Sequence, residues 1–190
     1  IIGNQTPDWN AGIRNMINYK NISFSFLIDI QEGGDFFSLD TYYGFATGIY
    51  DRSAGLNSLG NPKRDLVANG GGVLLDGVYA DGTQNTIFTE HQNYRNPFGY
   101  KTGIQEQHVW DASYVKLREI RLAYDIPTSL FGGFVNSASI SLIGKNLWII
   151  SKNSPYSDPE FGLSAGNITG YQSGAPLGVK EIGASLKLQF

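Results

Sequence analysis

Residues 179–190, VKEIGASLKLQF, alternate apolar and polar side chains up to the last residue of the chain. From Ile182 onward every second residue is apolar, and the residues between them are glycine or polar. Successive side chains of a β-strand point to opposite faces, so this stretch predicts a strand with one apolar and one polar face. A soluble sandwich also uses such strands, but the stretch has the length of a tilted strand that crosses a bilayer, about 9 to 11 residues.

Four more strands are predicted from the same alternation, and the full set is 9–19, 22–32, 109–126, 137–150 and 179–190. Because two residues separate the first pair, these strands are predicted to form an antiparallel hairpin. In the third strand the apolar residues change parity, which predicts a β-bulge between Leu117 and Ile120. Gly144 is expected to kink the fourth strand.

Two long connections, 33–108 and 151–178, separate the predicted strands, and both other connections are short. The first is rich in glycine turns, and its aromatic part, 36–50, has room for a short helix. Long loops are uncommon in compact soluble domains, whereas outer-membrane barrels carry short periplasmic turns and long extracellular loops. The alternation of short and long connections therefore favours an antiparallel membrane barrel with two long extracellular loops.

The aromatic and charged residues of the predicted strands fit a bilayer. If the chain ends at the periplasmic side, Trp9, Trp110 and Trp148 form an outer aromatic girdle, and Tyr19 and Tyr124 lie with the final aromatic residue near the inner ends. Phe190 is assigned as a carboxy-terminal barrel-insertion signal. On the first, second and last strands no charged side chain lies on the inferred apolar face, where a Lys or Arg near the midplane costs about 2 to 4 kcal/mol. Those predicted to line the lumen or face a plug are Arg14, Asp29, Glu119, Arg121 and Lys187.

Composition excludes several other classes of protein. Of 190 residues, 16% are charged, 13% are aromatic and 24 are glycine, a mixture typical of many strands joined by glycine turns. The net charge of -3 gives no basic surface for nucleic acid. The absence of cysteine removes disulfides and thiolate metal sites. Five strands cannot close a membrane barrel, which needs at least 8, so we expect the carboxy-terminal part of a larger barrel, and the start at Ile1 favours a mature or excised piece.

No catalytic or metal site is predicted. His91 and His108 are the only histidines, and both are expected to be solvated in loops. Asp158 and Glu160 flank a proline in a turn-rich loop, so a structural role is favoured over the facing carboxylates of a glycosidase. No cofactor motif is present.

Aromatic residues in the first long loop are candidates for substrate or lid contact. We select Tyr42, Tyr43 and Tyr50, because exposed aromatic residues anchor interfaces. The alternative is that these rings pack the loop onto itself.

The run DASYVKLREIRLAYDIP, residues 111–127, resembles the penultimate-hairpin signature of SusC/RagA-type TonB-linked outer-membrane proteins. The resemblance covers essentially the whole chain. Its further matches are GGDFF at 33–37, DGV at 76–78, DGTQN at 81–85, GKNLW at 144–148 and DPE at 158–160.

The resemblance implies a 22-stranded barrel of the Gram-negative outer membrane, with an amino-terminal plug. It also implies energy supply through TonB, a SusD-like surface lipoprotein as partner, and import of oligosaccharides or peptides without enzymatic chemistry or a cofactor. The alternative from the residues alone is a secreted or surface β-domain that binds carbohydrate through its loop aromatics and transports nothing.

Overall fold

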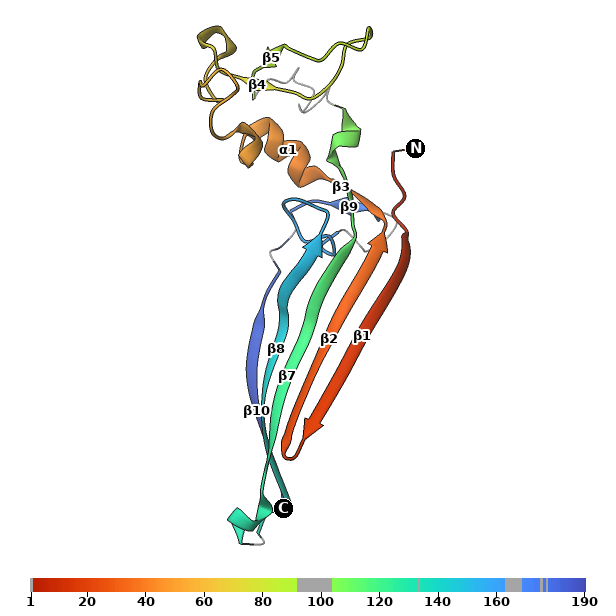
Figure 1. The fold of residues 1–190 in the computed structure, drawn as a ribbon, viewed down its shortest axis with the longest axis vertical. Helices are drawn as coiled ribbons and strands as arrows, with labels where there is room; N and C mark the ends of the chain where they lie inside the picture. Colours follow the sequence, from red (N-terminus) through yellow and green to blue (C-terminus); the bar gives the residue numbers. More distant parts are fainter. Residues whose placement is uncertain (1, 92–103, 133, 163–168, 175, 177) are drawn as a thin grey trace.

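The computed structural model describes residues 2–91, 104–132, 134–162, 169–174, 176 and 178–190. Its main element is a five-stranded antiparallel sheet in the order β1-β2-β7-β8-β10 (Figure 1). This sheet confirms the predicted fold class, a partial barrel wall built of long antiparallel strands. The strands are β1 Pro7–Tyr19, β2 Ile22–Gly33, β7 Tyr114–Ile126, β8 Ser137–Lys152 and β10 Glu181–Gln189.

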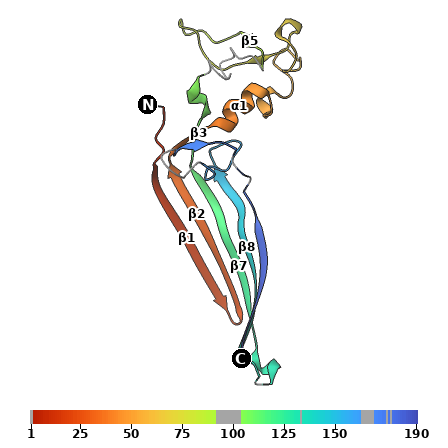
Figure 2. The same cartoon turned by 180° about the vertical axis from the view of Figure 1, so that it is seen from behind.

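The connections of the sheet are sorted between its two ends (Figures 1 and 2). The β1–β2 turn, the β7–β8 connection and the carboxy terminus lie at one end. The 3₁₀ helix η4 Thr128–Phe131 lies in the second of these connections. The longer connections lie at the other end, where residues 109–126, predicted as one strand, divide into β6 Val109–Asp111 and β7. The division has a structural reason, because β6 leaves the sheet to pair with β3 Asp35–Ser38.

A double irregularity interrupts the sheet where the parity change predicted it. Leu27 of β2 pairs with Glu119 and Ile28 with Leu117, so Arg118 is the extra residue of a bulge in β7. The register between β7 and β8 shifts at the same place. On β8 the irregular residue is Asn146, with φ 49°, and not the predicted Gly144. A bulge adds local twist and redirects side chains. It therefore changes which side chains of β7 share one face of the sheet.

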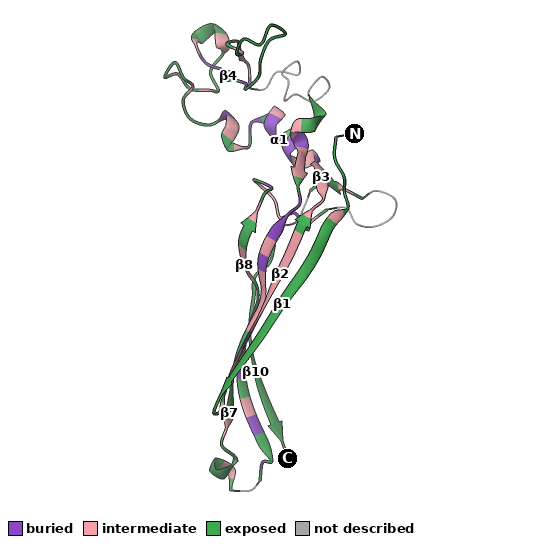
Figure 3. Cartoon of the chain, turned by 45° about the vertical axis from the view of Figure 1, so that its right-hand side comes forward, coloured by how far each residue is buried: buried purple, intermediate pink, exposed green. Residues whose placement is uncertain are grey.

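No second layer covers the apolar face of the sheet in the described part of the chain. Leu142 is 55% exposed, Leu186 62% and Ile182 83%. On the opposite, polar face Ser25 and Ser141 are buried. Strand β1, apart from Pro7, and strand β10 are exposed along their whole length (Figure 3). The register places no charged side chain on the apolar face below Glu32 at the outer end of β2. The apolar face is therefore left uncovered, whereas the apolar face of a soluble sheet packs against a core.

Beyond the end of the sheet lies a second structured part, which we call the extension, residues 35–91 and 104–111 (Figure 1). Strand β3 lies between β6 and β9 Tyr171–Gln172 in a small sheet, antiparallel to β6 and parallel to β9. The helix α1 Leu39–Thr47 begins at Ser38, whose side chain accepts a hydrogen bond from the Thr41 amide, and ends at the left-handed Gly48. The other elements are η1 Asp51–Ser53, η2 Val67–Asn69, β4 Val73–Leu74, β5 Phe88–Thr89 and η3 Gln105–His108.

None of the described helices is both long and apolar enough to cross a membrane.

Candidate functional site

A cluster of five charged side chains fastens the second long loop to the polar face of the sheet. Lys116 of β7 forms ion pairs with both Asp158 and Glu160 of the loop. Arg118 pairs with Glu160 and with Asp29 of β2, the latter at 2.6 Å between Nη2 and Oδ2. We call these five residues the loop cluster. It joins two neighbouring strands and the loop, so the loop is a fixed part of the wall.

The bulge in β7 places Glu119 on the same face of the sheet as the loop cluster. In a regular strand Lys116 and Arg118 would share a face, but Glu119 would then point the other way. Because Arg118 is the extra residue of the bulge, Arg118 contacts the loop while Glu119 still lies on the polar face. Tyr114, two residues before Lys116, donates its hydroxyl to Asp29 at 3.1 Å and lies beside Glu160 at 3.0 Å. One strand thus presents Lys116 and Arg118 to the same loop.

Burial makes the cluster sensitive to the loss of a partner. The side chain of Lys116 is 5% exposed and that of Asp158 13% exposed. Burial alone would raise the pKa of Glu160, but hydrogen bonds from Arg118 and Lys116 outweigh burial and lower this pKa to about 2. Glu160 is therefore charged at neutral pH, as the ion pairs require.

The same loop is also tied to the extension. Gln172 of β9 is fully buried, and its side-chain oxygen accepts hydrogen bonds from Ser38 at 3.0 Å and Ser157 at 2.7 Å. Its amide nitrogen donates to the Asp158 carbonyl at 3.3 Å. The backbone amide of Phe37 donates to the Gly170 carbonyl at 2.7 Å. One loop therefore bridges the barrel wall and the start of α1.

The aromatic residues of the extension form a core around His108. This histidine is fully buried, with ring centroids 5.2 Å from Tyr42 and 5.6 Å from Phe45. Burial, and secondarily the positive charge of Arg52, lower the pKa of His108 to about 4, so the ring is neutral at neutral pH. His91 is also buried, so the prediction of two solvated histidines is wrong. No pattern in the sequence indicates that the aromatic loop packs around an imidazole.

Tyr42, Tyr43 and Tyr50, predicted to contact substrate or lid, lie in different surroundings. Tyr50 stacks on Tyr156 at 4.1 Å between centroids, and Gly44 leaves space for it, since a Cβ there would lie 2.1 Å from the Tyr50 ring. Tyr42 packs against the His108 ring. Tyr43 alone of the three is exposed, at 50%. Two of these rings therefore serve the interior of the extension.

The residues predicted to line the lumen share the polar face but not one site. The register places Arg14 opposite Leu27, Arg121 opposite Ser25 and Lys187 opposite Ser139, all on the face that carries the loop cluster. Glu119 lies there too. Of the five predicted lumen residues, only Asp29 forms an ion pair with another residue in the described part of the chain. The residues that the predictions missed are Tyr114, Lys116 and Arg118, and their signal was two cations beside a predicted bulge.

The predicted girdle is only partly on the sheet. Trp9 and Trp148 lie on the apolar face near its outer end and are 49% and 60% exposed. Trp110 differs, because it belongs to β6 and its indole nitrogen donates to Thr41 at 3.3 Å inside the extension. At the other end Tyr19 and Tyr124 lie on the apolar face, at 68% and 42% exposure, and Phe190 packs edge-on against Phe134.

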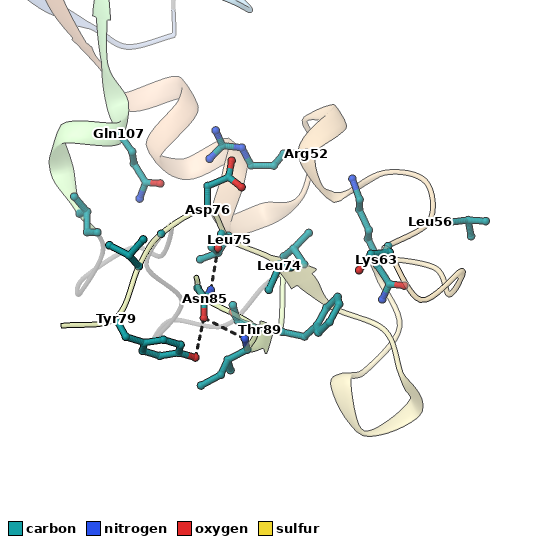
Figure 4. A pocket seen from close by; sticks show the side chains of 18 residues that line it. Arg52, Leu56, Lys63, Leu74, Leu75, Asp76, Tyr79, Asn85, Thr89 and Gln107 are labelled. Carbon is teal, nitrogen blue, oxygen red and sulfur yellow. Dashed lines mark hydrogen bonds between the residues drawn. The ribbon is translucent and has the colours of Figure 1, made fainter. Parts of the chain in front are cut away.

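The extension also holds an open cavity of about 920 Å³ (Figure 4). The ribbon 73–89 forms one wall, and Arg52, Leu56 and Lys63 line the other side. In the described residues no group of three His, Cys, Asp or Glu is placed to hold a metal ion.

Comparison with known proteins finds relatives that are named as receptors. No protein-family model matches the sequence. The TonB-dependent receptor P26 of Formosa agariphila is 28% identical over 200 residues, covering all of this chain and 18% of that receptor. The receptor P3 of the same organism is 26% identical over 161 residues, covering 84% of this chain and 13% of its own length. The chain thus spans less than a fifth of these relatives, whose names are those of receptors rather than enzymes.

Solved structures share the fold. The RagAB peptide importer in its open-open state aligns with a TM-score of 0.62 and 19% identity, covering 97% of this chain and 17% of that chain. The RagAB peptide transporter aligns with a TM-score of 0.64 and 18% identity, over all of this chain and 18% of that one. In sequence the chain is therefore similar to a segment of TonB-dependent receptors, and it shares its partial-barrel fold with the RagAB structures.

Proposed function

We propose that this chain is a wall segment, with its outer loops, of an outer-membrane importer that takes up oligosaccharides or peptides with energy delivered through TonB. The observation that carries the proposal is the uncovered apolar face of the five-stranded sheet. Side chains such as Leu186 and Ile182, 62% and 83% exposed, need hydrocarbon beside them. The names of the relatives, TonB-dependent receptors, support this class of transport.

The sheet has two open edges, at β1 and β10. In a bilayer, unpaired backbone groups cost several kcal/mol each. We therefore infer that further strands of a longer chain pair with both edges and close a barrel, and that the plug and the TonB contact belong to that longer chain.

The end of the sheet that carries the extension faces the outside in this proposal, since barrels keep short turns on the periplasmic side. A SusD-like lipoprotein is the proposed partner there. The solved relatives are parts of RagAB, a peptide importer with two named components, which supports a two-protein assembly.

The alternative function, carbohydrate binding by a secreted β-domain, needs aromatic rings that are exposed to solvent. Phe45 is 5% exposed, Tyr50 stacks on Tyr156, and Phe37 packs against Tyr171 at 5.3 Å. These rings contact one another, which favours the importer over the aromatic binder.

Uptake by cells tests the proposal. The full-length receptor is deleted and restored in its host, and accumulation of fluorescent oligosaccharides and of fluorescent peptides is measured with and without TonB. We expect uptake of one class to require both the receptor and TonB. Uptake of both classes that persists without the receptor, or that ignores TonB, would refute the importer.

A further inference from the structure

The short β7–β8 connection, residues 127–136, is apolar and carries no charge. Its sequence is PTSLFGGFVN, and two of its large side chains are exposed, Leu130 at 73% and Phe134 at 81%. The β1–β2 turn at the same end of the sheet consists of the polar pair Lys20 and Asn21, so a short turn here does not require apolar side chains (Figure 1). Exposed apolar side chains that gather in one place mark an interaction surface.

A ring contact places this connection on the apolar side of the sheet. Phe190 directly follows β10 and continues its alternation, so it shares the facing of Leu188. The rings of Phe134 and Phe190 meet edge-on, with centroids 6.3 Å apart. The backbone amide of Asn136 donates to the Gln189 carbonyl at 2.7 Å, which holds the connection beside the end of β10. The exposed ring of Phe134 therefore continues the apolar face of the sheet.

The length of β8 sets the depth at which the connection meets a bilayer. Trp148 and Ala138 lie on the apolar face of β8, about ten positions apart, and Ala138 pairs with Ile126 and Leu188. At about 3.3 Å per residue and a tilt of about 45°, this separation spans about 23 Å across the membrane. The apolar band of an outer-membrane barrel is about 25 Å tall. With Trp148 at the outer boundary, the connection follows at the inner boundary, where apolar and aromatic side chains settle between headgroups and acyl chains.

We propose that the β7–β8 connection is a membrane anchor whose exposed apolar side chains enter the phospholipid leaflet on the periplasmic side. The inference rests on the proposed function, because it takes the apolar face of the sheet to meet lipid. The occupant is phospholipid rather than a protein, since Phe134 is joined through Phe190 to that same face. A partner inside the barrel would instead meet the polar face.

Photocrosslinking of the full-length receptor in vesicles of phosphatidylethanolamine and phosphatidylglycerol tests the anchor. The photoreactive residue p-benzoylphenylalanine replaces Phe134 or, in a second variant that keeps the test alive if the first fails to assemble, Leu130. Mass spectrometry measures the phospholipid adducts after irradiation. The matched control is the same replacement at Gln189, which is exposed, precedes Phe190 and faces the other way, with its side-chain oxygen 3.1 Å from the Ser137 hydroxyl. We expect about tenfold more phospholipid adduct at Phe134 and at Leu130 than at Gln189.

Phospholipid adducts no more frequent than at Gln189, or adducts to a second receptor molecule in their place, would overturn the anchor. The same replacement at Leu186, on the apolar face of β10, separates this inference from the proposed function. Lipid adducts at Leu186 but not at the connection refute the anchor alone, whereas their absence at Leu186 refutes lipid contact of the sheet itself.

A second pair of variants tests whether Phe134 holds the connection in the leaflet. Phe134→Asp is expected to reduce phospholipid adducts from p-benzoylphenylalanine at Leu130 about threefold or more, because a carboxylate keeps the connection in water. Phe134→Leu, which stays apolar, is expected to leave them unchanged. Equal adduct yields in the two variants would contradict the anchoring role of Phe134.

Discussion

Lys116 is the residue on which attachment of the second long loop depends most. It is almost completely buried and neutralises two loop carboxylates, Asp158 and Glu160. Removing one partner of a buried ion pair leaves uncompensated charge and costs about 3 to 5 kcal/mol. We expect Lys116→Met to release the loop, measured as faster protease cleavage between residues 153 and 162 of the full-length receptor in intact cells.

The control for this variant is Lys187→Met. Lys187 lies on the same face of the sheet but is exposed and forms no ion pair in the described part of the chain. Its replacement should leave cleavage of the loop unchanged. If Lys116→Met and Lys187→Met were cleaved at equal rates, the loop cluster would have no role in holding the loop.

Because of Glu160, the attachment of the second long loop to the sheet is expected to weaken as the pH falls. Its pKa falls from an ordinary 4.5 to about 2 in the folded protein, so the attachment is complete above about pH 4.5 and weakens as the pH falls toward 2. The chain contains no cysteine, so Ser173→Cys gives this segment a single spin-label position. We expect the label to become more mobile between pH 5 and 3, and Glu160→Gln to remove most of this pH dependence. A flat response in the unmodified loop would contradict the assignment.

At the scale of the element, β10 tests which face of the sheet meets lipid. Leu186 and Ser185 are neighbours with opposite facing, paired with Ile140 and Ser141 of β8. Leu186→Lys is expected to cost about 2 to 4 kcal/mol near the bilayer midplane and to lower the amount of heat-modifiable, folded receptor in outer membranes. Ser185→Lys, on the polar face, should assemble normally. The opposite result would place lipid on the polar side.

Strands with strict alternation could be predicted from the sequence, but the points where the chain leaves the main sheet could not. The β1–β2 hairpin and the bulge near Arg118 follow from local parity. The division at Ala112 and the position of Trp110 depend on β6 pairing with β3, residues some seventy positions away, and parity carries no information about such a distant partner. The burial of His108 was missed for the same reason, since the rings around it come from α1 and β3.

At the scale of the whole molecule, the apolar face and the two open edges require neighbours. We expect residues 1–190, produced alone, to aggregate in plain buffer and to disperse only in detergent, because both the exposed apolar side chains and the unpaired strand edges seek partners. Size-exclusion chromatography with and without detergent measures this. A monodisperse monomer in plain buffer would support the alternative, a soluble binding domain.

The candidate site could be predicted only in outline. The charges on the polar face of the strands followed from alternation, but the loop cluster required knowledge of where residues 158 and 160 return to the sheet. The proline between two carboxylates favoured a structural role for this loop, and the structure shows that both carboxylates hold the loop to β7.

The parallel pairing of β9 with β3 has a mechanical consequence for this arc of the barrel. Because Tyr171 and Gln172 reach across the outer ends of β7 and β2 to pair with Phe37 and Ser38, the loop acts as a brace along the rim. Strands beneath a brace cannot splay apart without breaking it. In the proposed importer, a widening of the barrel mouth would therefore take place elsewhere on the circumference, with this arc held in place.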